Sequence, residues 1–401
     1  MNRTGQFSEN ADFDFEIRTV IGSASAGAAE VGEVLAAVSG IGRKDHAAWY
    51  QAWRGLADRV RTQADASADG GHPVSAAAAY LRASHYYAVA VNAASSLDRP
   101  DDLLEVFRLH RSAWDRFVDT TEVRAERVSI PYEGGALPGY LFRPAGERTT
   151  TPVLVAVNGS DGSLTSLWAD CVVGALRRGY SALVFDGPGQ QSMLFEHGSH
   201  FRPDWEHVLT PVYDFVSTLP GADAQRIALY GISQGGYWVP RALSFEHRYA
   251  AAVLDPGVTD VSASWKSQLP HSLLRLLENG EDEKFDRDMA IGMRFTPDTT
   301  STWAFRARPF GTTGYAQTLR AVEEYNLESI AHQITTPLFI TEPENEQFWP
   351  GQSQRLADLA PTVSALARFT AAEGADSHCE PLARALVEQR MFDWLDQQLG
   401  R

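Results

Sequence analysis

The stretch LYGISQGGYWVP, residues 229–240, places a serine between two glycines, and the interpretation of the whole chain starts from it. Gly231, Ser233 and Gly235 form the pattern G-x-S-x-G, preceded by the apolar run RIALY and followed by a helical pattern. A strand that turns sharply into a helix through such glycines lifts the serine hydroxyl above the sheet edge, where it can act as a nucleophile. Short glycine patterns also arise by chance, so an inert turn serine is the alternative, and the rest of the chain must supply the partners.

The residues around this stretch alternate short apolar runs with helical patterns. Buried strands are predicted at 152–159, 181–189, 226–231 and 250–257, with helices between them, and VRAERVSIPYEGGALPGYLFRP (123–144) predicts a hairpin around Gly-Gly. This rhythm is typical of an α/β fold with a mostly parallel sheet and helices on both faces.

Two further regions are predicted to be helical. In residues 1–122, the positions Trp49, Trp53, Leu56 and Val60 share one helical face, and helices are also expected over 75–91 and around the Leu103–Phe117 stripe. The second region, about 258–330, interrupts the strand–helix rhythm. We therefore expect an N-terminal helical lid domain, 1–122, and a catalytic domain, 123–401, that carries a helical insertion.

Composition narrows the classes of partner. The net charge of -16 argues against nucleic acid or an anionic membrane surface, because both need clustered positive charge. Two cysteines make no disulfide framework, and no signal-peptide pattern or membrane-spanning run is found, which favours a cytoplasmic protein. No metal-binding or dinucleotide motif is present, so neither metal nor cofactor is expected. A small-molecule substrate remains, with monomer and homodimer both open.

A base and an acid for Ser233 are predicted from chain order. His378, in EGADSHCEP, lies in the last strand-to-helix loop, where the order Ser…acid…His places the base. The acid is expected after the strand PLFIT, and laying EPENE over the common pattern H-G-x-x-D selects Glu346. The alternative is that Glu346 is solvated and another carboxylate, such as Asp376, orients the imidazole.

Two backbone amides are candidates for an oxyanion hole. The amide of Gln234 lies at a helix N-terminus, and the loop VNGSDGS (157–163) follows the strand that normally supplies the second donor. Ser160 is the first choice for this donor and Asp161 the second, while an ordinary turn is the alternative. Tyr86 and Tyr87 could line a substrate pocket, although aromatic residues in such helices more often form the core of the lid itself.

The assembled motifs resemble those of α/β-hydrolases. More narrowly, FDGPGQ (185–190), PDWEHVLTPVYDFV (203–216), GISQGG (231–236), TPLFIT (336–341) and GADSHCE (374–380) are similar to the group that contains 2,6-dihydroxypseudooxynicotine hydrolase and fungal polyketide-shortening hydrolases. This chain departs from the group in Glu346, where aspartate is usual, and in GQQS, where GQGE is common.

The resemblance implies a serine triad under a helical lid that cleaves an ester or an activated, β-diketone-like carbon–carbon bond. The substrate would be small and of an aromatic or polyketide type. Two other functions stay open: an acyltransferase or lactone-forming enzyme of secondary metabolism, and a catalytically dead binding protein on the same scaffold.

Overall fold

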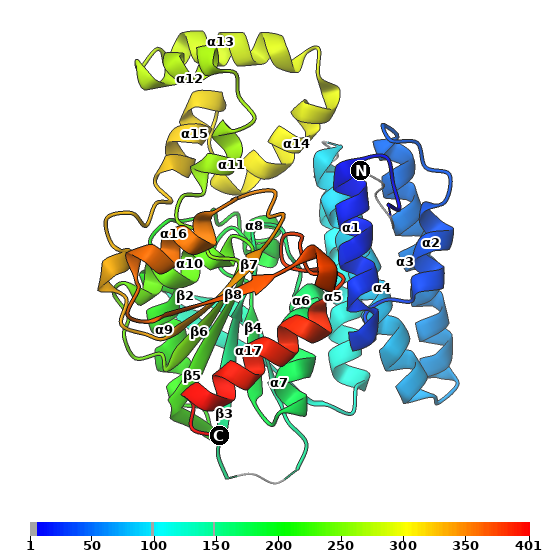
Figure 1. The fold of residues 1–401 in the computed structure, drawn as a ribbon. Helices are drawn as coiled ribbons and strands as arrows, with labels where there is room; N and C mark the ends of the chain where they lie inside the picture. The colour runs from blue at the N-terminus through cyan, green and yellow to red at the C-terminus, as the bar shows by residue number, and fades with distance from the viewer. Residues whose placement is uncertain (1–5, 98–99, 147–148) are drawn as a thin grey trace.

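The centre of the molecule is an eight-stranded sheet. A computed structural model describes residues 6–97, 100–146 and 149–401, and the strand order is β1-β2-β4-β3-β5-β6-β7-β8. The strands are β1 (Arg124–Tyr132), β2 (Gly135–Arg143), β3 (Thr151–Val157), β4 (Ser181–Phe185), β5 (Ala222–Ile232), β6 (Ala251–Asp255), β7 (Leu338–Pro343) and β8 (Ser364–Phe369). β2 pairs antiparallel with β1 and with β4, and the other five strand pairs are parallel, so the predicted α/β class with a mostly parallel sheet is confirmed (Figure 1).

The central strands are apolar along their whole length because helices cover both of their faces. Every residue of β3, β4 and β6 is buried. One face is covered by the N-terminal helices, by α6 (Leu164–Leu167), the π-helix η2 (Trp168–Val172), α7 (Val173–Arg177) and by α17 (Arg384–Gln398). The other face is covered by α9 (Glu206–Ser217), α10 (Gly235–Leu243) and α16 (Gln352–Leu359).

The predicted hairpin forms with a turn one residue earlier than the Gly-Gly pair. Tyr132 pairs with Gly135, so Glu133 and Gly134 make the two-residue turn and Gly135 begins β2. Both turn residues have positive φ angles, 44° and 78°, as a two-residue hairpin turn that matches the strand twist requires.

Among the described residues, five α-helices precede the sheet and lie beside it. They are α1 (Ala11–Gly22), α2 (Val31–Val38), α3 (His46–Asp69), α4 (Pro73–Ser96) and α5 (Pro100–Thr120). The Asn10 side chain begins α1 by accepting hydrogen bonds from the amides of Asp12 and Phe13. Their apolar faces share one continuous core with the sheet, which leaves them as a layer beside it (Figure 1).

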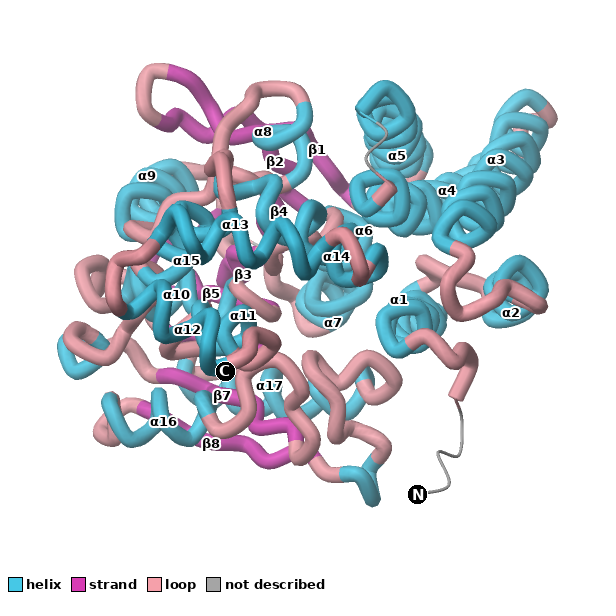
Figure 2. The backbone as a smooth tube through the Cα atoms, turned by 90° about the horizontal axis from the view of Figure 1, so that it is seen from above, coloured by secondary structure: helices cyan, strands magenta, loops and turns pink. Residues whose placement is uncertain are grey.

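A second group of helices is inserted between β6 and β7. It comprises α11 (Ser262–Lys266), α12 (His271–Glu278), α13 (Asp282–Met293), α14 (Pro297–Ala307) and α15 (Tyr315–Glu323), and it lies beyond the carboxyl ends of the parallel strands (Figures 1 and 2). Just after α14, the Arg308 side chain donates to the carbonyl oxygen of Ser95 at the end of α4 (3.2 Å). We propose that residues 1–122 form a helical lid domain and that residues 123–401 form a catalytic domain, which carries this insertion.

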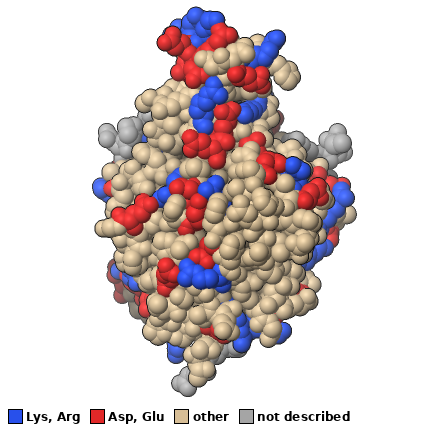
Figure 3. Space-filling model, turned by 90° about the vertical axis from the view of Figure 1, so that its left-hand side faces the viewer, with Lys and Arg blue, Asp and Glu red and all other residues tan. Residues whose placement is uncertain are grey.

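The surface carries charges of both signs. On the face shown in Figure 3, Lys and Arg lie among Asp and Glu instead of gathering into a basic patch. Within the described part of the chain, none of the helices combines the length and apolar character that a membrane span needs.

Candidate active site

Ser233 lies on a strained turn between β5 and α10. Its φ angle is +53°, in the left-handed region that non-glycine residues rarely adopt. The turn is so tight that a Cβ atom at Gly231 would lie 2.5 Å from the carbonyl oxygen of Gly235, and one at Gly235 would lie 2.7 Å from that of Val157. The Ser233 amide donates to the carbonyl oxygen of Asp255 (2.6 Å). This geometry is that of a nucleophile elbow.

The structure brings the three residues selected from chain order into one hydrogen-bonded chain. The Ser233 Oγ atom lies 2.9 Å from Nε2 of His378, and His378 Nδ1 lies 2.8 Å from Oε2 of Glu346. Glu346 follows β7, and His378 lies in the loop between β8 and α17, so all three residues meet at the carboxyl ends of parallel strands. A serine, a base and an acid in this relation can perform nucleophilic catalysis.

The carboxylate of Glu346 is held ionised although its side chain is 5% exposed. Its second oxygen, Oε1, accepts hydrogen bonds from the amides of Phe348 (2.8 Å) and Trp349 (3.1 Å). Burial alone would raise the pKa of this carboxyl, but the charge and hydrogen bond of His378, together with the two amides, lower it below its ordinary value. The alternative acid, Asp376, instead accepts from the Asn345 side chain (2.6 Å).

The loop after β3 lies directly against Ser233. A Cβ atom at Gly159 would lie 2.8 Å from the Ser233 Cβ atom, so only glycine fits without displacement. The Asn158 side chain holds the loop by accepting from the Gly159 amide (2.9 Å) and donating to the Ser163 carbonyl (2.7 Å). Within the described residues, the amides of Ser160 and Gln234 donate no hydrogen bond, and both residues line the same cavity as Ser233.

Gln190 of the DGPGQ stretch supports the same loop from behind. Its Nε2 atom donates to the carbonyl oxygens of Asn158 (3.0 Å) and Gly159 (3.1 Å), and its Oε1 accepts from the Gly187 amide (2.8 Å). The next residue, Gln191, has a φ angle of +31° and lines the cavity. The DGPGQ stretch, which contributed to the family resemblance, therefore positions the loop after β3, where one oxyanion-hole donor is predicted.

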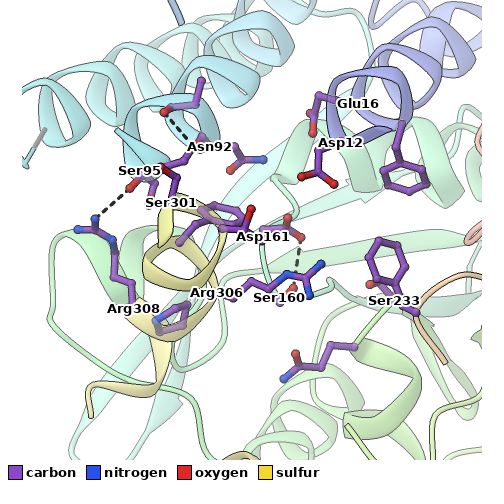
Figure 4. A pocket seen from close by; sticks show the side chains of 18 of the residues that line it. Asp12, Glu16, Asn92, Ser95, Ser160, Asp161, Ser233, Ser301, Arg306 and Arg308 are labelled. Atoms are coloured by element: carbon purple, nitrogen blue, oxygen red, sulfur yellow. Dashed lines mark hydrogen bonds between the residues drawn. The ribbon is translucent and has the colours of Figure 1, made fainter. Parts of the chain in front are cut away.

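Two adjoining cavities meet at Ser233 and His378. The larger, which we call the aromatic cavity, has a volume of about 240 Å³ and is lined in part by Phe15, Phe195, Trp265, Phe305, Phe348 and Trp349. The smaller, which we call the rear cavity, has about 130 Å³ and reaches Cys379 and Arg384. Figure 4 shows Asp12 and Glu16 entering the aromatic cavity from α1, while Arg306 and Arg308 enter it from the insertion.

Asp161 lines both cavities, whereas Tyr86 and Tyr87 line neither of them. Both rings are fully buried inside the helical layer. Their hydroxyls donate to Glu33 (2.8 Å) and Asp58 (2.6 Å), respectively. The two tyrosines therefore belong to the core of the N-terminal helices, which is the alternative that the sequence analysis named.

Helix α1 supplies cavity residues that the motif analysis did not select. Phe15 and Glu16 line both cavities, and the Phe15 ring lies 6.2 Å from the ring of His378. Burial, followed by the neighbouring carboxylates of Asp161 and Asp12, raises the pKa of Glu16 to about 8. The sequence did carry a helix signal here, because Asn10 is a capping residue and Phe13, Ile17 and Val20 follow it at i, i+4 and i+7. This pattern predicts a helix, but it does not predict which parts of the fold the helix contacts.

The buried guanidinium of Arg384 connects the turn that carries Ser233 to the loop that carries His378. Arg384 at the start of α17 contacts the Asp255 carboxylate, the Cys379 carbonyl oxygen and the Tyr230 hydroxyl, each at 2.8 Å. Asp255 is the residue whose carbonyl oxygen binds the Ser233 amide, and Cys379 follows His378. A single side chain therefore restrains the two segments that must keep Ser233 and His378 together.

Among the residues described, no group of three or more His, Cys, Asp or Glu side chains is arranged to hold a metal ion. Both cysteines are free thiols.

Comparison with known proteins places this chain in a family. No protein-family model matches it. Hydrolase acrC of Aspergillus aculeatus is 31% identical to it over 421 residues, covering 96% of each chain. Alpha/beta hydrolase xenA of Xenoacremonium sinensis is 30% identical over 85% of this chain and 84% of its own. The chain belongs to the α/β-hydrolase family.

The predicted resemblance is thereby confirmed, and the chain is a hydrolase. Its fold is also similar to the crystal structure of 2,6-dihydroxy-pseudo-oxynicotine hydrolase, with a TM-score of 0.74 and 19% sequence identity over 94% of this chain and 95% of that one. Because the similarity covers 94% of this chain, it includes the N-terminal helices of this chain as well as its sheet.

Proposed function

We propose that this hydrolase cleaves an ester or an activated carbon–carbon bond of a small substrate through a Ser233–His378–Glu346 triad and an acyl-enzyme. The observation that carries the proposal is the unbroken hydrogen-bonded chain from Ser233 through His378 to Glu346, which opens into the aromatic cavity. The many aromatic side chains of this cavity support an aromatic or polyketide-type substrate, because stacked rings bind flat apolar groups.

In the first half-reaction, Ser233 Oγ attacks the substrate carbonyl carbon while His378 Nε2 takes its proton. The amides of Gln234 and Ser160 hold the resulting oxyanion. Collapse of this intermediate breaks the bond to the leaving group, which departs with the bonding electron pair as an alkoxide or an enolate and takes the proton from His378. A carbon–carbon bond can break in this way only if a neighbouring carbonyl accepts the electron pair.

In the second half-reaction, water attacks the acyl-enzyme and His378 takes its proton. The carboxylic acid then leaves and the Ser233 hydroxyl is restored. Glu346 accepts from His378 Nδ1 throughout and stabilises the imidazolium, so it stays ionised.

The test compares wild type with Ser233→Ala on p-nitrophenyl esters and aryl β-diketones, with products identified by mass spectrometry. We expect Ser233→Ala to lose turnover by about 10⁴-fold or more and to lose labelling by a fluorophosphonate, with an unchanged circular dichroism spectrum. Retained turnover in Ser233→Ala would exclude the mechanism. Products joined to an added alcohol or amine instead of water would show an acyltransferase, and an unlabelled, inactive wild type would show a binding protein.

A further inference from the structure

Arg306, in the last turn of α14, has an unpaired guanidinium inside the aromatic cavity. Its side chain is half-buried and lines the same cavity as Ser233 and His378 (Figure 4). Within the described residues, no hydrogen bond or ion pair reaches this guanidinium, and its one defined contact is with a ring, the Phe348 centroid, 5.5 Å from Cζ. A cation left unpaired in a catalytic cavity is available to a ligand.

The other arginines that line the two cavities are paired. Arg308 donates to the Ser95 carbonyl oxygen (3.2 Å), and Arg384 is bound to Asp255 (2.8 Å). Carboxylates also line the aromatic cavity, at Asp12, Glu16 and Asp161, but none of these lies within ion-pairing distance of Arg306. Among the described residues, Arg306 therefore differs from Arg308 and Arg384 in that no acceptor binds its guanidinium.

Phe348 fixes Arg306 close to the proposed triad. The Phe348 ring packs edge-on against the His378 ring, with centroids 4.8 Å apart, and the Phe348 amide donates to Glu346 (2.8 Å). The guanidinium lies over the face of this same ring. One aromatic side chain thus separates Arg306 from the base that would serve Ser233.

We propose that Arg306 binds an anionic pair of oxygens on the substrate, a carboxylate or a 1,3-dicarbonyl enolate that is separate from the carbonyl attacked by Ser233. This inference rests on the proposed function and specifies its substrate class. A carboxylate and a β-diketone enolate both present two coplanar oxygens that share one negative charge, and the planar fork of a guanidinium binds such a pair with two parallel hydrogen bonds.

The electrostatics of the opposite wall are compatible with an anion. The pKa of Glu16 is about 8, so this side chain is mostly protonated at neutral pH and adds little negative charge to the cavity. In its acid form, Glu16 can also donate one hydrogen bond to a substrate oxygen. The remaining carboxylates, Asp12 and Asp161, are exposed to solvent.

The kinetic test uses two p-nitrophenyl esters of matched chain length, the glutarate monoester, which carries a free carboxylate, and the neutral pentanoate. We expect Arg306→Leu to lower kcat/KM for the glutarate ester by about 10- to 100-fold and to leave the pentanoate within about 3-fold of wild type. Arg294→Leu is the matched control, since Arg294 is exposed on the same insertion and lines neither cavity. Equal losses on both esters, or no loss on either, would overturn the proposal.

A binding test separates this proposal from the proposed function because it needs no turnover. Benzoylpropanoate and its neutral amide are titrated into Ser233→Ala protein by calorimetry. We expect the anion to bind about 10-fold or more tightly than the amide, and Ser233→Ala/Arg306→Leu to abolish the difference. Equal affinities in the Ser233→Ala protein would refute the role of Arg306. A wild type that hydrolyses neither ester but shows this preference would refute only the hydrolytic mechanism.

Discussion

The Nδ1 atom of His378 lies 2.8 Å from Oε2 of Glu346, whereas Asp376, two residues before the histidine, bonds to Asn345 instead. Glu346 therefore takes the position that we propose for the triad acid. The longer glutamate side chain is ordered by two backbone amides on its other oxygen, which offset its greater conformational freedom.

The first prediction concerns this carboxylate. Glu346→Gln should reduce kcat by about 10³- to 10⁴-fold, because an amide cannot stabilise the imidazolium or fix the histidine tautomer. Initial rates on p-nitrophenyl esters measure this effect. Glu344→Gln, an exposed carboxylate two residues earlier, should leave kcat unchanged. A larger loss in Asp376→Asn than in Glu346→Gln would transfer the role to Asp376.

The second prediction concerns the contact between Gly159 and Ser233. Gly159→Ala should lower kcat by about 10²-fold or more, because its Cβ atom would lie 2.8 Å from Ser233 Cβ and displace either Ser233, the proposed nucleophile, or the loop after β3. Rates and fluorophosphonate labelling would both decrease. Gly32→Ala makes the same chemical change at a position where the new Cβ atom has no atom within 4 Å, so kcat should stay at the wild-type value. Wild-type rates in Gly159→Ala would mean that the loop is free to move.

The third prediction concerns the buried Arg384. Arg384→Ala should lower the free energy of unfolding by about 3–5 kcal/mol, because it leaves the Asp255 carboxylate buried without its cation. Urea denaturation measures the loss. Arg355→Ala removes an exposed arginine that pairs with Glu328, and its unfolding midpoint should stay close to that of wild type. Equal midpoints in the two variants would contradict the structural role given to Arg384.

The fourth prediction concerns pH and Glu16. The pKa of this group is raised from 4.5 to about 8, so between these values the folded state holds a proton that the unfolded state has released. Stability from this group is therefore fully present below pH 4.5 and is lost as the pH rises through about 8.

Glu16→Gln removes this dependence, so its urea midpoint should decline less than that of wild type between pH 5 and pH 8 (about the interval between the two pKa values). Glu9→Gln, an exposed neighbour, should keep the wild-type slope. Parallel slopes for Glu16→Gln and wild type would show that Glu16 titrates normally.

Local patterns were sufficient to predict the sheet and the order of the three proposed triad residues. Apolar runs such as PVLVAV must be buried on both sides, and GISQGG forces a tight turn, so strand, turn and helix follow from the residues themselves. Once the parallel order is inferred, the residues that follow each strand must meet at one edge. Ser233, Glu346 and His378 were therefore predictable from their places in the chain.

Contacts between distant segments decided the rest. The sequence left a pocket position and a core position open for Tyr86 and Tyr87, and it could not show that Glu33 and Asp58 accept hydrogen bonds from their hydroxyls. The approach of α1 to His378, and of Arg306 to Phe348, joins segments that are far apart in sequence. Side-chain packing at such tertiary contacts depends on the shapes of both segments, and a local sequence pattern carries information about only one of them. The sequence alone therefore determined the α/β fold and the candidate nucleophile, and only the tertiary structure decided which side chains surround it.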